Sequence, residues 1–171
     1  MCPQTLYMAL LTLYENNLRG LHWKLAGPNF NKDHLRFGDY YDQLGAFLDE
    51  TAEMMITMGI PPVSVMTIRE ILSGDDVNAI SIDMSRDYTG EAANTAAQQM
   101  FTQLYEKAAA LAKDDSLPVD VQDVYMAHAK YYRIECLYKL QRTLANQTGE
   151  PNPADNPAPA EEPPVEGDNN E

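Results

Sequence analysis

The sequence predicts an all-α protein built as an antiparallel four-helix bundle with one long crossover. Apolar residues recur every three or four positions in four long segments, which is typical of helices with one buried face. Two short turns and one longer link separate these segments, and no strand-like alternation competes with them. The chain has 171 residues, of which 44% are hydrophobic and 22% charged, enough for one domain with a full core.

Residues that end or begin helices bound each segment. The first helix is expected from about residue 3 to Gly27 and Pro28, and the second from about 31 to 58, before Gly59. The third is expected over 91–113, and the fourth from Pro118, which suits a first helical turn, to about 146. The expected buried stripes are Tyr7, Leu11, Tyr14, Leu18, Leu21 and Leu25 in the first helix, Phe37, Tyr41, Leu44, Leu48, Thr51 and Met55 in the second, and Ala93, Ala97, Met100, Leu104, Ala108 and Leu111 in the third.

The link between the second and third helices is expected to carry a short helix. Residues 64–72 fit a helix capped by Ser64, and the following stretch to Tyr88 is rich in Gly, Asp and Ser. Short outer loops with one long crossover, carrying a short helix between helices two and three, are the ferritin-like arrangement of a four-helix bundle. One domain is therefore expected over residues 1–148.

The remaining residues, 149–171, differ in composition from this domain. They hold six of the 11 prolines and seven acidic residues, with no Lys or Arg, and contribute half of the formal net charge of −14. Such a segment has too little apolar surface to offset its ordering entropy, so an acidic, disordered tail is expected.

Cysteine content and hydropathy favour a reduced, cytoplasmic protein. Cys2 and Cys136 do not form a disulfide framework, and Cys136 is expected to be buried and inert. The first residues lack the basic stretch of a signal peptide, and no apolar run is long enough to span a membrane.

Imidazole and carboxylate side chains gather along one side of the second helix. His34, Asp42, Asp49 and Glu53 lie within about 100° of one another on a helical wheel, and His22 lies near the end of the first helix. Oxygen and imidazole nitrogen together are good ligands for Fe(II). The alternative is a solvated acidic face with unrelated histidines, because no Glu has a His three residues later, as central di-iron bundles require.

The segment LHWKLAGPNFNKDHLRFGDYYDQLGAFLDETAE, Leu21 to Glu53, resembles the signature of the Dps family, the mini-ferritins named as DNA-binding proteins from starved cells. The resemblance rests on the pair His22–Trp23, the Gly-Pro turn, His34, and the spacing of Asp49 and Glu53. It implies a ferroxidase centre between subunits, with His22 and His34 from one subunit and Asp49 and Glu53 from the next. It also implies a twelve-subunit shell, and a redox role for Trp23 unless that residue only packs in the core or an interface.

One position departs from the family pattern. The family usually has an acidic ligand four residues after the second His, and this chain has Gly38 there. The first iron site is therefore expected to be complete, and the second to rely on Asp42 or water. An alternative reason for the glycine is close packing against a neighbouring helix.

Two further groups have competing interpretations. Asp114, Asp115, Asp120 and Asp123 either line an iron-entry pore, as the same region does in ferritin-like shells, or cap the fourth helix. His128 shares a helix face with Glu135 and is expected to pack with hydrogen bonds rather than bind metal.

The leading hypothesis is therefore an iron-storage ferroxidase that oxidises Fe(II) with hydrogen peroxide and mineralises Fe(III) in a hollow shell, protecting against oxidative damage. The alternatives are a non-enzymatic metal-sequestering cage and a helical interaction protein that recruits partners by its acidic tail. DNA binding is not expected, because phosphate contacts need Lys and Arg, no lysine-rich extension precedes the first helix, and the first basic residue is Arg19.

Overall fold

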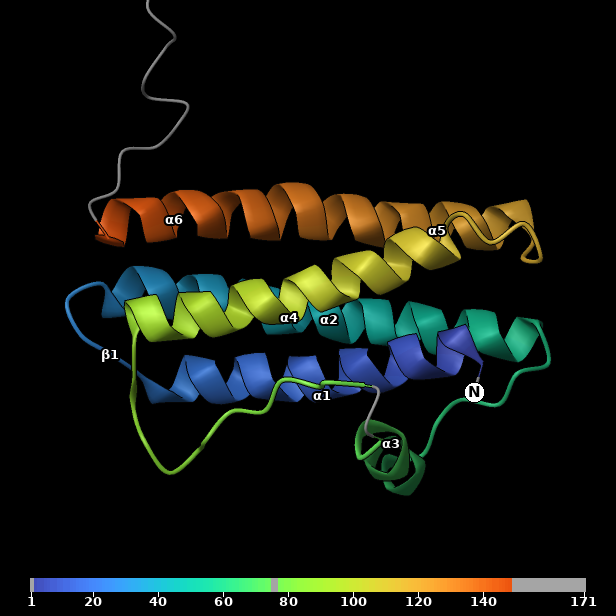
Figure 1. Ribbon diagram of the computed structural model, residues 1–171, viewed down its shortest axis with the longest axis horizontal. Helices are drawn as coiled ribbons and strands as arrows, with labels where there is room; N and C mark the ends of the chain where they lie inside the picture. Colours follow the sequence, from blue (N-terminus) through green and yellow to red (C-terminus); the bar gives the residue numbers. More distant parts are fainter. Residues whose placement is uncertain (1, 75–76, 149–171) are drawn as a thin grey trace, which may run out of the picture.

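Four long helical stretches lie side by side in the structure, a computed structural model that describes residues 2–74 and 77–148 (Figure 1). They are α1 (Pro3–Lys24), α2 (Phe30–Thr57), α4 (Gly90–Leu111) and a final stretch. That last stretch comprises α5 (Val119–Tyr131), a π-helical segment η1 (Tyr132–Leu137) and α6 (Tyr138–Thr148). The predicted helices are thus confirmed, with ends that differ by a few residues, as helix ends commonly do.

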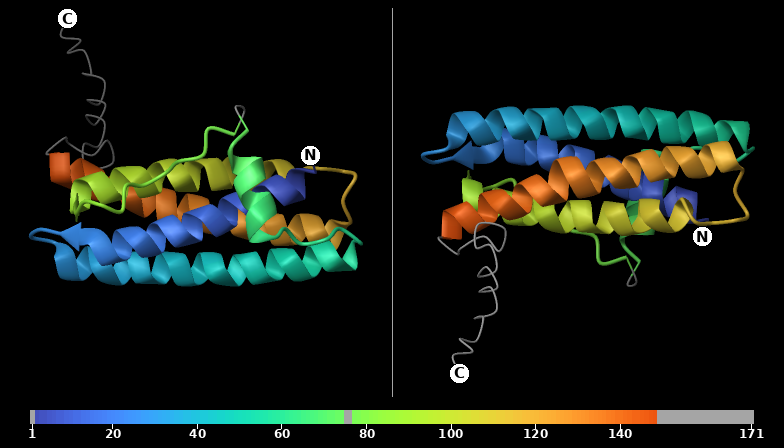
Figure 2. Two further views of the ribbon diagram at one scale, coloured as in Figure 1. Left: turned by 90° about the horizontal axis from the view of Figure 1, so that it is seen from below. Right: turned by 90° about the horizontal axis from the view of Figure 1, so that it is seen from above.

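The crossover between α2 and α4 returns along the whole length of the bundle. It includes α3 (Val65–Leu72), which lies outside the bundle across α1 (Figure 2). The Ser64 hydroxyl caps α3 by accepting a hydrogen bond from the backbone N–H of Thr67. The crossover ends in β2 (Tyr88–Thr89), which pairs in parallel with β1 (Leu25–Ala26), a short ladder that the sequence did not predict. The connectivity is that of a ferritin-like four-helix bundle, as expected.

The buried core follows the predicted stripes closely in α1 and α4. Every residue of the first and third predicted stripes is buried. In α2 the prediction was partly wrong, because Tyr41 and Leu48 are only partly buried, whereas Tyr40 and Phe47 belong to the core. The reason is the rotation of α2 between its neighbours, which turns Tyr40 and Phe47 into the core and leaves Tyr41 and Leu48 at its edge.

The π-helical segment adjusts the register of the last helix. The buried residues His128, Tyr132, Cys136 and Leu140 are spaced by four. In an α-helix of 3.6 residues per turn, each such step rotates the side chain by about 40°. The longer i→i+5 turns of η1 counter this rotation. All four side chains therefore stay in the core.

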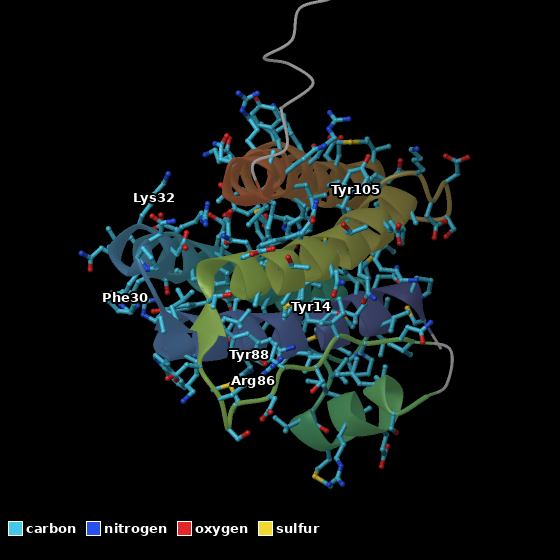
Figure 3. All side chains as sticks on the ribbon, turned by 60° about the vertical axis from the view of Figure 1, so that its left-hand side comes forward. Tyr14, Phe30, Lys32, Arg86, Tyr88 and Tyr105 are labelled. Atoms are coloured by element: carbon cyan, nitrogen blue, oxygen red, sulfur yellow. The ribbon has the colours of Figure 1, made fainter. Side chains whose placement is uncertain are left out.

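The crossover is fastened to the bundle at Ile80. The hydroxyl of Tyr14 accepts a hydrogen bond from the Ile80 backbone N–H (3.1 Å) and donates to the side chain of Gln103 on α4. The side chain of Asn17 donates to the Ile80 carbonyl (2.8 Å). Figure 3 shows Tyr14 on α1, facing α4. The backbone N–H and the carbonyl of Ile80 are thus both hydrogen-bonded by side chains of α1.

The predicted tail, 149–171, lies outside the described residues. Within the two ranges that the structure covers, no helix combines the length and the apolar character needed to cross a membrane.

Replacing Tyr14 by Phe should loosen this fastening without changing the core volume. The Ile80 N–H would lose its partner, at a cost of about 1–3 kcal/mol in the free energy of unfolding. Urea denaturation would measure the loss of unfolding free energy, and amide hydrogen exchange would measure the loss of protection at the Ile80 N–H. Tyr138→Phe is the control, because Tyr138 is exposed. Unchanged exchange at Ile80 in the Tyr14 variant would contradict the assignment.

Candidate metal centre

Two histidines are brought face to face where α1 turns into α2. The turn contains Gly27, whose φ of 111° is accessible mainly to glycine. It returns the chain so that the rings of His22 and His34 stack with centroids 3.6 Å apart and an interplanar angle of 22°. The structure therefore brings these two residues together within a single chain.

Reciprocal hydrogen bonds fix the orientation of both rings. Nδ1 of His22 lies 2.8 Å from the carbonyl oxygen of His34, and Nδ1 of His34 lies 3.0 Å from the carbonyl oxygen of His22. A carbonyl only accepts, so each Nδ1 carries the hydrogen and donates. In the neutral form, each Nε2 then keeps its lone pair. This is how metal-binding histidines are commonly held, with the second nitrogen bound to a backbone or carboxylate acceptor.

Aromatic neighbours hold the histidine pair from both sides. Phe30 stacks on His34 with ring centroids 4.9 Å apart, and Tyr41 meets His22 edge-on at 5.3 Å. Figure 3 shows Phe30 at the start of α2. The guanidinium of Arg19 lies over the Tyr41 ring, 5.1 Å from its centroid. These contacts restrict both imidazoles before any metal binds.

Gly38 lies against this pair. A Cβ atom at this position would be 3.7 Å from Cε1 and 3.8 Å from Nδ1 of His22, which are ordinary van der Waals distances. Close packing therefore does not require a glycine, and the alternative based on packing is not supported. A longer side chain at position 38 would start beside the ring of His22.

The predicted carboxylates do not join the histidines within one chain. Asp42, Asp49 and Glu53 are exposed on α2. Among the residues described, no three His, Cys, Asp or Glu side chains gather in a way that could hold a metal ion. A single chain thus offers two imidazole nitrogens in one place and carboxylates in another. This arrangement completes a ligand set only if another copy supplies the missing half.

One buried carboxylate on the same helix as His22 was missed. Glu15 is 7% exposed and pairs with Arg19. Burial raises the pKa of Glu15, Arg19 opposes this, and the charge of Asp42 raises it further. Glu15 precedes His22 by seven residues, two helical turns, so the spacing was available as a signal.

The structure excludes one of the three interpretations of Trp23. Its side chain is 65% exposed, so a place in the core of this chain is excluded.

The acidic loop before α5 does not cap that helix through side chains. Pro118 occupies the cap position and no side-chain hydrogen bond is made there. Asp114 instead accepts bonds from the backbone N–H (3.0 Å) and hydroxyl (2.6 Å) of Ser116, which lower the pKa of Asp114. Asp115, Asp120 and Asp123 are exposed. Asp120 lies in the first turn, where only the helix dipole favours its charge.

His128 packs with hydrogen bonds, as predicted, although its carboxylate partner is Glu50 and not Glu135. It is fully buried, and its Nε2 lies 2.9 Å from a carboxylate oxygen of Glu50. Glu135 pairs with Lys139 instead. Cys136 is buried as expected, and burial raises the pKa of its thiol, which keeps it protonated.

Comparison with known proteins gives matches in sequence over part of the chain. Over 70 residues the chain is 31% identical to the DNA protection during starvation protein of Listeria innocua, covering 41% of this chain and 44% of that one. Over 55 residues it is 38% identical to the protein of the same name from Porphyromonas gingivalis, covering 32% and 35%. The matches therefore span less than half the length of these relatives. No family model matches the chain.

Solved structures agree over most of the fold. Dps from Mycobacterium smegmatis superposes with a TM-score of 0.71 and 22% identity, covering 83% of this chain and 84% of that one. A Vibrio cholerae DPS protein, described as a member of a broad superfamily of ferritin-like diiron-carboxylate proteins, gives 0.70 and 19%, covering 83% and 86%. The chain is thus a sequence relative of the Dps proteins and has their ferritin-like fold.

Proposed function

We propose that this protein is an iron-binding mini-ferritin that oxidises Fe(II) with hydrogen peroxide at sites shared between subunits. The observation that carries the proposal is the His22–His34 pair, with both Nδ1–H groups bound to carbonyls and both Nε2 atoms left to accept a metal. The relationship to Dps proteins and the description of one structural neighbour as a diiron-carboxylate protein support it. Iron is the substrate of this reaction.

The proposed centre is completed across an interface. His22 of one subunit and Asp49 and Glu53 of another would hold the first Fe(II), since exposed carboxylates one turn apart on α2 can reach a neighbouring copy. Two Fe(II) ions supply the two electrons that convert one hydrogen peroxide and two protons into two waters. The resulting Fe(III) would move into a central cavity and mineralise. We infer a closed shell of twelve subunits, with Asp114, Asp115, Asp120 and Asp123 lining its entry pores.

The second iron would be held less tightly. His34 would bind it with Asp42 or water, because Gly38 brings no side chain to the histidine pair. This feature favours the second candidate function, a cage that sequesters metal and oxidises it slowly. A helical interaction protein is the third candidate, and the absence of a large particle in solution would favour it.

Replacing both Asp49 and Glu53 by Ala should abolish most peroxide-driven iron oxidation. We expect a fall of at least tenfold in the rate of Fe(III) formation, followed by absorbance, because the carboxylates supply the charge that Fe(II) needs. The particle size should not change. The matched control replaces two exposed carboxylates of α4, Glu91 and Glu106. A rate equal to that of the unmodified protein would exclude Asp49 and Glu53 as ligands.

Replacing Gly38 by Asp should strengthen the second site. The side chain added at this position would start 3.7 Å from the ring of His22, which stacks on His34 at 3.6 Å, so its carboxylate could join His34 at the second site. Binding of a second Co²⁺ per site, measured by calorimetry, should tighten at least tenfold. Gly45→Asp is the control, because Gly45 lies in the same helix with no atom within 4 Å of the added Cβ. Both substitutions change helix propensity alike, so equal Co²⁺ binding in the two variants would rule out a missing ligand at position 38.

The function that we propose does not involve DNA. At a formal net charge of −14 per chain, an assembly should repel a duplex, most strongly at low salt. In a gel-shift experiment at low ionic strength and neutral pH, the metal-free protein should leave the DNA band unmoved. A retarded band would overturn the prediction, and a band that appears only after removal of residues 149–171 would show that the tail masks a site.

A further inference from the structure

A continuous hydrogen-bonded chain of four side chains crosses the bundle. It is separate from the pair formed by His22 and His34. It connects Glu50 on α2, His128 on α5, Tyr7 on α1 and Tyr132 on η1. The distances are 2.9 Å from Glu50 to Nε2 of His128, 3.0 Å from Nδ1 of His128 to the Tyr7 hydroxyl, and 2.7 Å between the two tyrosine hydroxyls. Tyr7, His128 and Tyr132 are fully buried, while the Glu50 side chain is 51% exposed.

The direction of every hydrogen bond follows from the carboxylate at one end. Burial lowers the pKa of His128, against the opposing effect of Glu50, and this favours the neutral imidazole. An ionised Glu50 only accepts, so Nε2 of His128 carries the hydrogen and Nδ1 accepts. The Tyr7 hydroxyl must then donate to Nδ1, and Tyr132 must donate to the oxygen of Tyr7.

This arrangement makes Tyr7 different from the other buried tyrosines. Within the described residues, the hydroxyls of Tyr40 and Tyr125 are buried without a hydrogen-bond partner. Tyr14 donates to an amide oxygen, which is not a base. Tyr7 alone among the tyrosines of these ranges donates to an imidazole. A phenol gives up an electron readily only when its proton has an acceptor at hydrogen-bond distance, because the protonated radical is a very strong acid.

The surroundings hold this donor and acceptor in place. Phe47 stacks on the His128 ring with centroids 3.8 Å apart, and Tyr125 meets the Tyr7 ring edge-on at 5.5 Å. The π-helical segment begins at Tyr132, and such segments occur frequently at functional sites. Simple ionisation of Tyr7 is unfavourable in this environment, since burial raises its pKa. Loss of the proton therefore has to accompany loss of an electron.

We propose that Tyr7 is a redox-active side chain that gives up one electron while its hydroxyl proton moves to Nδ1 of His128. The O–H bond of Tyr7 breaks and an N–H bond forms, giving a neutral phenoxyl radical and an imidazolium that pairs with ionised Glu50. The electron goes to an oxidant of the hydroxyl-radical class, which becomes hydroxide. A later electron from Fe(II) returns Tyr7 to its starting state, with the proton coming back from His128.

The source of such an oxidant rests on the proposed function. One Fe(II) that meets hydrogen peroxide alone yields Fe(III), hydroxide and a hydroxyl radical, and a centre with a weak second site is the setting in which iron reacts singly. Tyr7 would quench that radical inside the protein. The net result is a second Fe(II) oxidised and no radical released. The redox chemistry of Tyr7 itself does not depend on this source.

The test uses two oxidants, so that the two proposals can fail separately. Metal-free protein is oxidised by a photogenerated one-electron oxidant, and a second sample receives Fe(II) and hydrogen peroxide; both are freeze-quenched for electron paramagnetic resonance. In the metal-free sample we expect a tyrosyl radical that Tyr7→Phe reduces at least tenfold and the control Tyr125→Phe leaves unchanged. His128→Gln, which removes the base, should also reduce it. An undiminished radical in Tyr7→Phe overturns the proposal.

A second measurement needs no substitution. In D2O the radical of the unmodified protein should show coupling to exchangeable deuterons hydrogen-bonded to the phenoxyl oxygen, and a radical without such coupling would overturn the assignment to Tyr7. The iron sample reports on the proposed function. If iron is not oxidised there while the metal-free sample gives the Tyr7 radical, ferroxidase activity is contradicted and the role of Tyr7 is supported.

Discussion

The short turn between α1 and α2 is the constraint on which the rest of the structure depends. It must reverse the chain between Lys24 and Phe30, and Gly27 allows this with a positive φ. The reversal sets the register of the two helices, and that register decides which rings meet. His22 and His34 stack and exchange hydrogen bonds only because the two helices start from this fixed point. At the same end, Leu25 pairs with Tyr88, so the turn also fixes where the crossover delivers the chain to α4.

Two hydrogen-bonded networks connect polar side chains inside the bundle, where a polar group without a partner is costly. One network ties three helices together at the end near the turn. Arg36 pairs with Asp33 and donates to Asn94 of α4 (2.8 Å) and Thr143 of α6 (2.8 Å). The second network is the chain from Glu50 to Tyr132. The first network is suited to holding the helices in register, whereas the second holds a base against a phenol.

The division of ligands also follows from packing. A helix that lies in a bundle gives one face to the core and leaves the other to solvent or to another copy. The histidines lie at the border of these faces and are half-buried, while Asp49 and Glu53 lie on the outer face. A centre built from both sets is therefore a property of the assembly that we propose, and the single chain supplies two incomplete halves. In the assembly that we propose, metal binding and oligomerisation would be coupled, because each would strengthen the other by mass action.

The sequence by itself determined the helices, their order and the bundle with one long crossover. Periodicity is a local property, so every residue of the stripes predicted for α1 and α4 is buried, although Leu10 and Phe101 were missed. The expectation that His22 and His34 belong together came from the resemblance to the Dps signature. The buried face of α2 was only partly predicted. Whether Tyr40 or Tyr41 enters the core depends on how a helix rotates between two neighbours, and a helical wheel carries no information about those neighbours.

Only the tertiary structure decided the remaining features. Tyr7 and His128 are 121 residues apart in the chain, and Glu50 and His128 are 78 apart, so no local pattern could connect them. The π-helical segment was hidden for a related reason, because it corrects a four-residue spacing that looks helical in sequence. The spacing of Glu15 from His22 was visible in the sequence, but its burial and its pairing with Arg19 were not. Local periodicity fixes what each helix can bury, whereas contacts between helices depend on packing, and packing exists only in the folded chain.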